Sequence, residues 1–378
     1  MDLGLTETQQ MLKNSAREFL EKECPHTYVR AMEEDEKGYT TEMWKKLAEV
    51  GWLGLPFPEA YGGGGGSFLD LCILLEEMGR ALLPGPFFPT VVLAGLTVLD
   101  AGSEAQKGDI LPKIAAGDLI ATFAITEPSA RWDAEGIREV QATRRGDRWV
   151  LNGTKLFVPY AHIADLLLVA ARTSSQGDPT QGITCFLVPS NAPGLQQTLL
   201  KTIASDRQSE VVFRDVAVPA DALLGPVDGG WPIVERAIQR AAAALCCWMV
   251  GGAQRVLEMT VEYAKTRIQF GRPIGSFQAV QHHCANMATD VEGMRWVAYQ
   301  AAWTVGEGLD ARMEVAVAKA WCSDAYRRVC ALAHQCHGAI GFTKEHNLQL
   351  YTRRAKAAEL LYGDPDFHRE VVAQGMRL

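Results

Sequence analysis

The chain has 378 residues, of which 48% are hydrophobic and 22% charged, and its formal net charge is −8 at pH 7. This length predicts two or three modules with their own cores, and the composition is typical of a globular rather than a disordered protein. The acidic balance argues against nucleic acid as a partner, and no apolar run approaches the roughly 20 residues that span a bilayer.

The cysteines indicate the redox environment. Their number, nine, is odd, no Cys-x-x-Cys pair occurs, and Cys246 and Cys247 are adjacent, which is poor geometry for an ordinary disulfide. The first ten residues lack the charged and apolar regions of a signal peptide. We therefore expect reduced thiols and a cytoplasmic location. The eight histidines form no metal-binding signature, so we expect no metal site.

Residues 1–117 have a helical pattern. Apolar side chains recur at helical spacing from Met11 to Leu20 and from Met43 to Leu53, and a striped helix over Asp70–Leu83 stops at a Pro-Gly-Pro breaker. Five glycines at 62–66 separate these helices. Because no Gly-Lys-Ser/Thr follows them and no strand precedes them, they predict a flexible turn rather than a phosphate-binding loop.

The pattern changes at residues 118–226. Short runs rich in β-branched residues, such as Leu119–Ile125 and Ala164–Ala171, alternate with Gly, Asp, Pro and Ser. The Arg-Gly-Asp-Arg sequence at 145–148 predicts a hairpin between two of these runs. These residues are expected to form a β module, either a barrel or a sandwich.

Residues 227–378 are helical again. Apolar-striped segments cover Trp231–Gln269, Phe277–Gly306 and Arg312–Gly338, and a shorter helix follows near 350–361. Successive long helices favour an antiparallel four-helix bundle. The predicted fold class is therefore α+β, with an N-terminal helical domain, a middle β domain and a C-terminal bundle.

Two segments of the C-terminal module carry residues suited to a phosphorylated ligand. Arg267 lies one turn before the end of a predicted helix and Phe270 follows it; a forked guanidinium suits a pyrophosphate, and an aromatic ring can stack on a purine. In the segment 335–341, glycines let backbone N–H groups approach phosphate oxygens. A helix end with a basic cap and a tight helix connection are the alternative interpretations.

Two segments of the β module lie where loops leave strands. The polar segment 125–133 follows the first predicted strand, a usual place for ligand contacts. Asn152-Gly153 predicts a hairpin turn, and Phe157 follows it in an apolar strand. Ordinary surface loops are the alternative for both segments.

Together these four segments resemble one family, the acyl-CoA dehydrogenases, and the resemblance covers nearly the whole chain, including Pro58–Gly63 and the helix with Glu76, Glu77 and Arg80. The resemblance implies the three-domain order described above, an acyl-CoA substrate, an electron-transfer flavoprotein as electron acceptor, and FAD sites shared across a dimer interface. It also assigns positions to the flavin. Those facing the partner's flavin are Arg267, Phe270, Gln278, Gln335, Gly338 and Ala339, and those facing the subunit's own isoalloxazine ring include Thr126 and Phe157.

Three departures from the family pattern fall on the subunit's own cavity. Arg131-Trp132 replaces Gly-Ser, where the serine meets the CoA thioester arm, so Trp132 takes a substrate-binding position. Phe157-Val158-Pro159 replaces Trp-Ile-Thr, which removes a hydroxyl and a backbone N–H near the flavin. Tyr362 stands where most members have the catalytic glutamate.

The reaction removes an α-proton while hydride leaves the β-carbon, so it needs a carboxylate base. Asp364, two residues beyond the usual place, is one candidate. Some relatives carry the glutamate on the first bundle helix, near Ala241 here; Glu235 is the nearest acid, but six residues rotate it by about 240°. Arg240, beside that position, is a candidate contact for the thioester ligand, with a solvated helix arginine as the alternative.

These departures favour an accessory subunit of a heteromeric α₂β₂ acyl-CoA dehydrogenase, of the kind that degrades steroid side chains and other bulky acyl groups. A homologous companion subunit would then supply the glutamate. The first alternative is a self-sufficient homo-oligomer with Asp364 or Glu235 as its base. The others are an acyl-CoA-processing relative with different chemistry and a scaffold without flavin.

Overall fold

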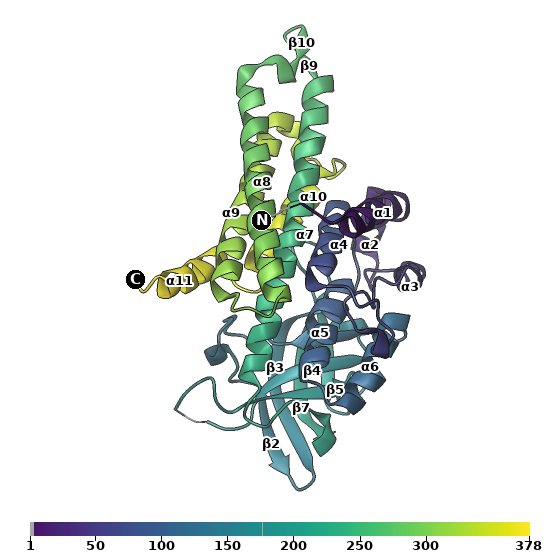
Figure 1. The fold of residues 1–378 in the computed structure, drawn as a ribbon, viewed down its shortest axis with the longest axis vertical. Coiled ribbons are helices and arrows are strands. Elements are labelled where there is room, and N and C mark those ends of the chain that lie inside the picture. Colours follow the sequence, from purple (N-terminus) through teal and green to yellow (C-terminus); the bar gives the residue numbers. More distant parts are fainter. Residues whose placement is uncertain (1–3, 176) are drawn as a thin grey trace. The chain divides into compact units, whose positions relative to one another are not determined.

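This computed structural model describes residues 4–175 and 177–378, and the chain divides into two compact units. One unit extends to Arg30 and adds Ser67–Leu83 and Ala242–Leu378; the other comprises Ala31–Gly66 and Pro84–Ala241. The division therefore falls inside two helices, α2 (His26–Glu34) and α7 (Trp231–Thr266). Figure 1 labels the elements along the chain.

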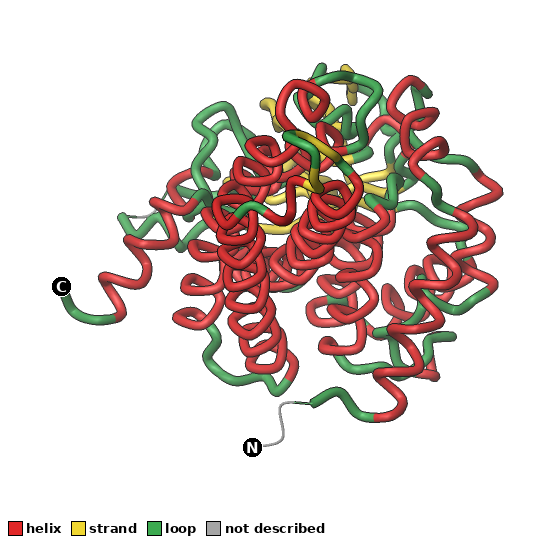
Figure 2. Tube along the Cα trace, turned by 90° about the horizontal axis from the view of Figure 1, so that it is seen from above, coloured by secondary structure: helices red, strands yellow, loops and turns green. Residues whose placement is uncertain are grey.

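The first unit is helical. Helix α9 packs against α8, α10 and α11, while α4 packs against α1 and α8. Figure 1 labels α8 and α9 side by side, and Figure 2 colours the helices red and the strands yellow. A short hairpin of β9 (Ile268–Gln269) and β10 (Arg272–Pro273) joins α7 to α8. The other elements are α1 (Glu7–Glu23), α2 (His26–Glu34), which continues into the second unit, α4 (Phe68–Ala81), α8 (Gln278–Gly306), α9 (Arg312–His337), α10 (Leu348–Leu360) and α11 (Pro365–Gly375).

The second unit is built on one sheet with the strand order β6-β7-β3-β2-β4-β5-β8, and β1 pairs with β4 in parallel. The strands are β1 (Ala121–Ala124), β2 (Gln141–Arg145), β3 (Arg148–Pro159), β4 (Leu166–Arg172), β5 (Ile183–Pro189), β6 (Leu195–Leu200), β7 (Gln208–Pro219) and β8 (Leu223–Leu224). Its helices are α3 (Thr41–Glu49), α5 (Leu96–Ala101), α6 (Glu104–Ala116) and the π-helix η2 (Phe88–Gly95), which packs on β1.

The order of helical, β and helical elements confirms the predicted fold class. Side-chain oxygens cap several helices where the sequence changes from polar to apolar, and three caps are reciprocal capping boxes: Thr6 with Gln9, Ser67 with Asp70, and Ser103 with Gln106. Within residues 4–175 and 177–378, no helix is long and apolar enough to cross a membrane.

The glycine run at 62–66 is not the flexible turn that the sequence predicted. Backbone N–H groups of Gly63 to Gly66 all donate to carbonyls of residues 54–58, at 2.8–3.1 Å. A Cβ on Gly63 would lie 2.0 Å from the carbonyl oxygen of Phe57. Gly63 therefore serves a close approach of two backbone segments that leaves no room for a side chain, whereas a Cβ on Gly65 would meet nothing within 4 Å.

Two further glycines let α4 and α7 touch through their backbones. A Cβ on Gly79 would lie 1.9 Å from the carbonyl oxygen of Trp248, and one on Gly251 would lie 1.7 Å from that of Glu76. Because the close contact on each side is backbone, a side-chain movement cannot relieve it. This crossing holds the N-terminal helix α4 against the C-terminal bundle.

We expect Gly251→Ala to lower the free energy of unfolding by more than about 2 kcal/mol, because the new methyl group forces α4 and α7 apart. Gly108→Ala in α6 is the matched control: its added Cβ meets nothing within 4 Å, so helix propensity should stabilise that variant by about 0.5–1 kcal/mol. Urea unfolding of both variants measures the difference. Equal stabilities would contradict the proposed backbone contact.

Candidate functional site

A fully buried ion pair lies at the centre of the β module. Lys155 Nζ is 2.8 Å from Glu127 Oε1, and the two side chains are 0% and 1% exposed. Lys155 also donates to the carbonyl oxygen of Ile125, at 2.8 Å. Burial lowers the pKa of Lys155, and the adjacent Glu127 carboxylate opposes that effect. The pair joins the end of β1 to the middle of β3.

The Glu127 carboxylate also anchors the following loop. It accepts hydrogen bonds from the backbone N–H groups of Arg138, Glu139 and Val140, at 2.7, 2.6 and 3.2 Å. With the ammonium of Lys155, these bonds satisfy both carboxylate oxygens, as a buried charge requires. The loop from residue 128 to residue 137 is thus closed at its two ends by one side chain.

The same pair places Thr126 next to the strand that carries Phe157. The N–H of Leu156 donates to the carbonyl oxygen of Thr126, at 2.9 Å. Phe157 has a left-handed backbone (φ 54°) within a β-bulge of β3, and it is 45% exposed. The bulge turns the ring out of the strand. An outward aromatic ring beside a buried threonine suits a planar ligand such as an isoalloxazine ring.

The loop after Thr126 carries the bulky substitutions. Ala130 has φ 54°, and the chain turns there into Arg131, whose guanidinium pairs with Asp133 at 2.5 Å and with Glu135 at 2.9 Å. Arg131 lowers the pKa of Asp133. The charge of Arg131 is thus neutralised within its own loop, and Trp132, which is partly exposed, is the bulky apolar group of this segment.

The first bundle helix presents no carboxylate at the alternative base position. Ala241 is 0% exposed. Its neighbour Arg240 pairs with Asp100 of α5, at 2.5 Å, and donates to the carbonyl oxygen of Leu96. Glu235 is partly exposed, further towards the N-terminus of the helix. The structure thus shows Arg240 as an ion-paired side chain, 17% exposed, rather than a solvated one.

The turn that carries Tyr362 is held by two buried basic side chains. His368 Nε2–H donates to the carbonyl oxygen of Tyr362 at 2.9 Å, and Lys319 Nζ donates to that of Gly363 at 2.8 Å. Burial lowers the pKa of His368 to about 4 and that of Lys319 to about 8. Tyr362 itself is 6% exposed and has φ 57°, an unusual conformation for an aromatic residue.

Asp364, the acid nearest to that turn, is a helix cap. Its Oδ1 accepts the N–H of Phe367 at 2.8 Å and so begins α11. The side chain is nevertheless partly exposed, so it remains available for contact with a ligand.

The segments predicted to face a partner's flavin lie on the surface of the helical unit. Phe270, at the tip of the β9–β10 hairpin, is 91% exposed with φ 53°; Arg267 and Gln278, on either side of the hairpin, are also exposed. At the end of α9, Gln335, Gly338 and Ala339 are exposed, and a Cβ on Gly338 would meet nothing within 4 Å. Tyr263, one turn before Arg267, stacks on His337, directly before Gly338, with ring centroids 4.5 Å apart.

These features fit a dinucleotide. An exposed aromatic ring, a guanidinium, two amide side chains and an open glycine provide stacking, charge and hydrogen bonding without rearrangement. Two elements of the site escaped sequence analysis, the Glu127–Lys155 pair and Lys319. The available signal was the presence of single charged residues within otherwise apolar segments, because such residues are rarely buried without a partner.

Comparisons with known proteins agree along the whole chain. Three family models match: the N-terminal domain of acyl-CoA dehydrogenase over residues 6–118, the middle domain over 122–216 and the C-terminal domain over 228–377. The probable acyl-CoA dehydrogenase YngJ of Bacillus subtilis is 34% identical over 381 residues, 99% of each chain.

Solved structures also match along the whole chain. A chain in the ChsE4–ChsE5 complex from Mycobacterium tuberculosis superimposes with a TM-score of 0.90 and 31% identity, covering 100% of this chain and 99% of that one. The FAD complex of PigA superimposes with a TM-score of 0.93 and 27% identity, covering 100% of both chains.

Breaking the buried pair should be costly. We expect Lys155→Met to lower the free energy of unfolding by about 3–5 kcal/mol, because it leaves the Glu127 carboxylate buried without its cation. Lys113→Met, which removes an exposed pair with Asp109, should change stability by less than about 1 kcal/mol. Chemical denaturation compares the two variants. A Lys155→Met loss no larger than the Lys113→Met loss would show that the pair is not the anchor of these loops.

Proposed function

The chain belongs to the acyl-CoA dehydrogenase family of FAD-dependent oxidoreductases, and from this premise we propose that it is the accessory subunit of a heteromeric acyl-CoA dehydrogenase. The proposed complex forms an enoyl-CoA from an acyl-CoA by removing hydrogen from the α and β carbons. Bound FAD supplies the hydride acceptor for that reaction. The companion subunit supplies the glutamate that takes the α-proton.

The observation that carries the proposal is the Tyr362 turn. Hydrogen bonds from His368 and Lys319 to its carbonyls keep the backbone in place, so the departure lies in the side chain. Tyr362 offers a phenol where the reaction needs a carboxylate to accept the α-proton. The other family position for the base carries Ala241, which has no ionisable group.

The exposed residues of the helical unit also support the accessory-subunit role. We infer that Arg267, Phe270, Gln278, Gln335, Gly338 and Ala339 hold the companion's flavin, since each is exposed and the family pattern is largely kept at these positions. On the β module, Phe157 retains an aromatic face near Thr126, whereas Trp132 and Pro159 alter the positions that serve the subunit's own thioester and flavin. The ChsE4–ChsE5 complex shows that this fold occurs in a complex of two differently named chains.

Further details belong to the same proposal. An electron-transfer flavoprotein is the proposed electron acceptor, and the nine free thiols support a cytoplasmic location. A bulky acyl group, such as a steroid side chain, is the proposed substrate; the small residues Ala241–Ala244, which the sequence offers as space for it, are each 0% exposed and would have to face the acyl group in the complex. Arg240 contacts the thioester ligand only if it leaves Asp100, because the two are paired at 2.5 Å.

A second candidate function is a homo-oligomeric dehydrogenase with its own base. The observation in its favour is that Asp364 lies in the same turn as Tyr362 and is partly exposed. Against it, the carboxylate already caps α11.

We expect the chain purified alone to be colourless and the complex with its homologous companion to be yellow, with about one flavin per pair of chains. The reason is that this chain offers the outer surface of a shared site but an altered inner one. Absorption at the flavin bands, against protein concentration, gives the ratio. A yellow homo-oligomer with about one flavin per chain, reduced by acyl-CoA at normal turnover, would disprove the accessory role.

Two acid-to-amide substitutions separate the candidate functions. In the complex, Asp364→Asn and Glu235→Gln should leave turnover within about twofold, because the companion supplies the base. Asparagine caps helices as well as aspartate does, so α11 stays folded in the first variant. If either variant lost more than about 100-fold in turnover, the range expected for removal of a general base, the second candidate function would be correct.

A further inference from the structure

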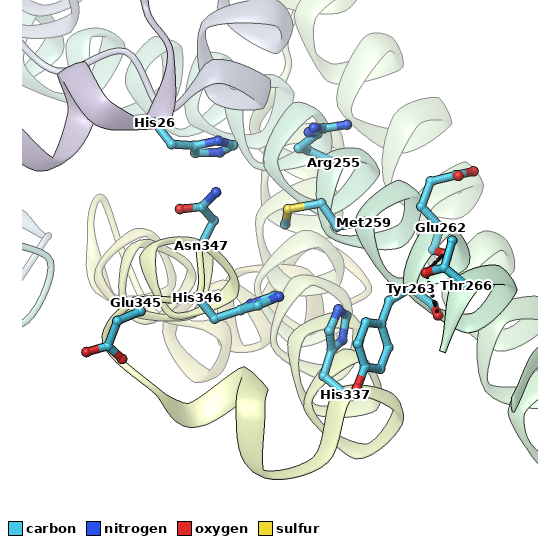
Figure 3. Close-up of a pocket in the computed structure, with 10 residues that line it drawn as sticks. All are labelled: His26, Arg255, Met259, Glu262, Tyr263, Thr266, His337, Glu345, His346 and Asn347. Atoms are coloured by element: carbon cyan, nitrogen blue, oxygen red, sulfur yellow. Dashed lines mark hydrogen bonds between the residues drawn. The ribbon is translucent and has the colours of Figure 1, made fainter. Parts of the chain in front are cut away.

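A cavity of about 460 Å³ lies within the helical unit, between α7, the end of α9 and the segment before α10. Figure 3 shows its ten lining side chains. The six positions assigned to the partner's flavin and the Tyr362 turn are not among its lining residues, although His337 lies in the segment 335–341. The volume lies in the range of small-molecule sites. The lining residues are His26, Arg255, Met259, Glu262, Tyr263, Thr266, His337, Glu345, His346 and Asn347.

One end of the cavity offers a hydrogen-bond acceptor without a partner. His337 Nδ1 lies 2.8 Å from the carbonyl oxygen of Ala333, so Nδ1 carries the proton and donates. Nε2 therefore bears a lone pair, and among the described residues nothing donates to it. Burial lowers the pKa of His337, which keeps the ring neutral. His337 is only 5% exposed. Figure 3 shows its ring beside Tyr263, directed towards His346 and Met259.

A donor stands next to this acceptor. The N–H of Leu348 donates to His346 Nδ1 at 3.2 Å, so in the neutral ring the proton lies on Nε2. Burial lowers the pKa of His346 as well. The rings of His337 and His346 are 4.9 Å apart at 62°. A metal ion does not suit this pair, because the proton on His346 Nε2 occupies the lone pair that a metal would need.

The other end of the cavity is cationic. Arg255 lines it and makes one ion pair, with Glu258 at 3.3 Å, and its side chain is 36% exposed. Beside it, burial and the charges of Arg255, Arg30 and Arg354 lower the pKa of His26 to about 4. In Figure 3 the carboxylates of Glu262 and Glu345 point away from the enclosed space.

The two ends are separated by a fixed length. Arg255 and Tyr263 lie on α7, eight residues apart, which corresponds to about 12 Å along the helix. Tyr263 stacks on His337, so this length also separates the cationic end from the paired donor and acceptor. A ligand that uses both ends carries an anion at one end and a flat group with adjacent donor and acceptor at the other.

We propose that this cavity is a binding site for an adenosine phosphate, with adenine at His337 and His346 and the phosphate at Arg255. The exocyclic amine of adenine donates to His337 Nε2, and an adjacent ring nitrogen accepts from His346 Nε2–H. A guanidinium is the preferred partner of a phosphate. Free nucleotides and the adenosine end of coenzyme A present this same chemistry.

The proposed site is distinct from the flavin surface. Gln335 and His337 are two residues apart on α9, so their side chains point about 200° apart around the helix. Gln335 is exposed, whereas His337 is buried against Tyr263. The proposal therefore does not depend on the accessory-subunit assignment, and either can fail without the other.

Isothermal titration of the purified full chain with AMP tests the proposal, and the variants below, none of which changes a flavin position, separate this cavity from the flavin surface. We expect saturable binding of one AMP per chain. Arg255→Gln should weaken AMP at least tenfold but leave adenosine binding unchanged, and His337→Phe, which keeps a ring against Tyr263, should weaken both at least tenfold. Arg327→Gln is the matched control, because Arg327 also pairs with an acid three residues away, Asp324, but lies outside the cavity.

His346→Phe gives a second variant at the base end, on a more exposed residue, should His337→Phe fail to fold. Competition by coenzyme A against AMP would support the cofactor's adenosine end as the natural occupant, and its absence would support a free nucleotide. Lack of AMP binding at millimolar concentration would overturn the proposal. AMP binding unchanged by Arg255→Gln and by the folded base-end variants would overturn it as well.

Discussion

The buried pair of Glu127 and Lys155 is the constraint on which the β part of the site depends. Removing two charges from water is costly, and the cost is met here by close geometry and by three backbone N–H groups that share the carboxylate. The result is that the loop with Trp132 and the strand with Phe157 are fixed to one point. Groups that contact a cofactor need such a rigid support, because small displacements weaken binding and catalysis.

In the helical unit, buried basic side chains likewise fix the backbone of a turn. Lys319 and His368 donate to successive carbonyls of the turn at Tyr362, and Lys319 also donates to the carbonyl oxygen of Glu359 at the end of α10. A turn held in this way keeps its backbone geometry whatever side chain it carries. In the function proposed above, a tyrosine in this turn removes the base without disturbing the fold, so that an accessory subunit retains the shape of a catalytic one.

Much of the fold could be predicted from sequence because it depends on local periodicity. The change from helical to alternating apolar spacing gave the order of the three modules, and the turn residues gave several helix ends. The pairing of Glu127 with Lys155 could not be read from the sequence, since 28 positions separate them and only the sheet register brings them together. The left-handed backbone of Phe157 could not be predicted either, because it results from a bulge in the register of β3 with β7. The glycine run at 62–66 was misjudged because glycine serves both flexibility and close packing.

The site residues carried over by resemblance are of two kinds, and the structure separates them by chemistry. Arg267, Phe270 and Gln278 need only be exposed to act on another subunit's flavin, and they are. A base must be ionisable and have lone pairs to spare. Tyr362 offers a phenol, Ala241 has no ionisable group, and Asp364 uses Oδ1 to cap α11 while it keeps further lone pairs. A chain with intact outward contacts and no carboxylate at either family position for the base is consistent with one that completes a site in another subunit.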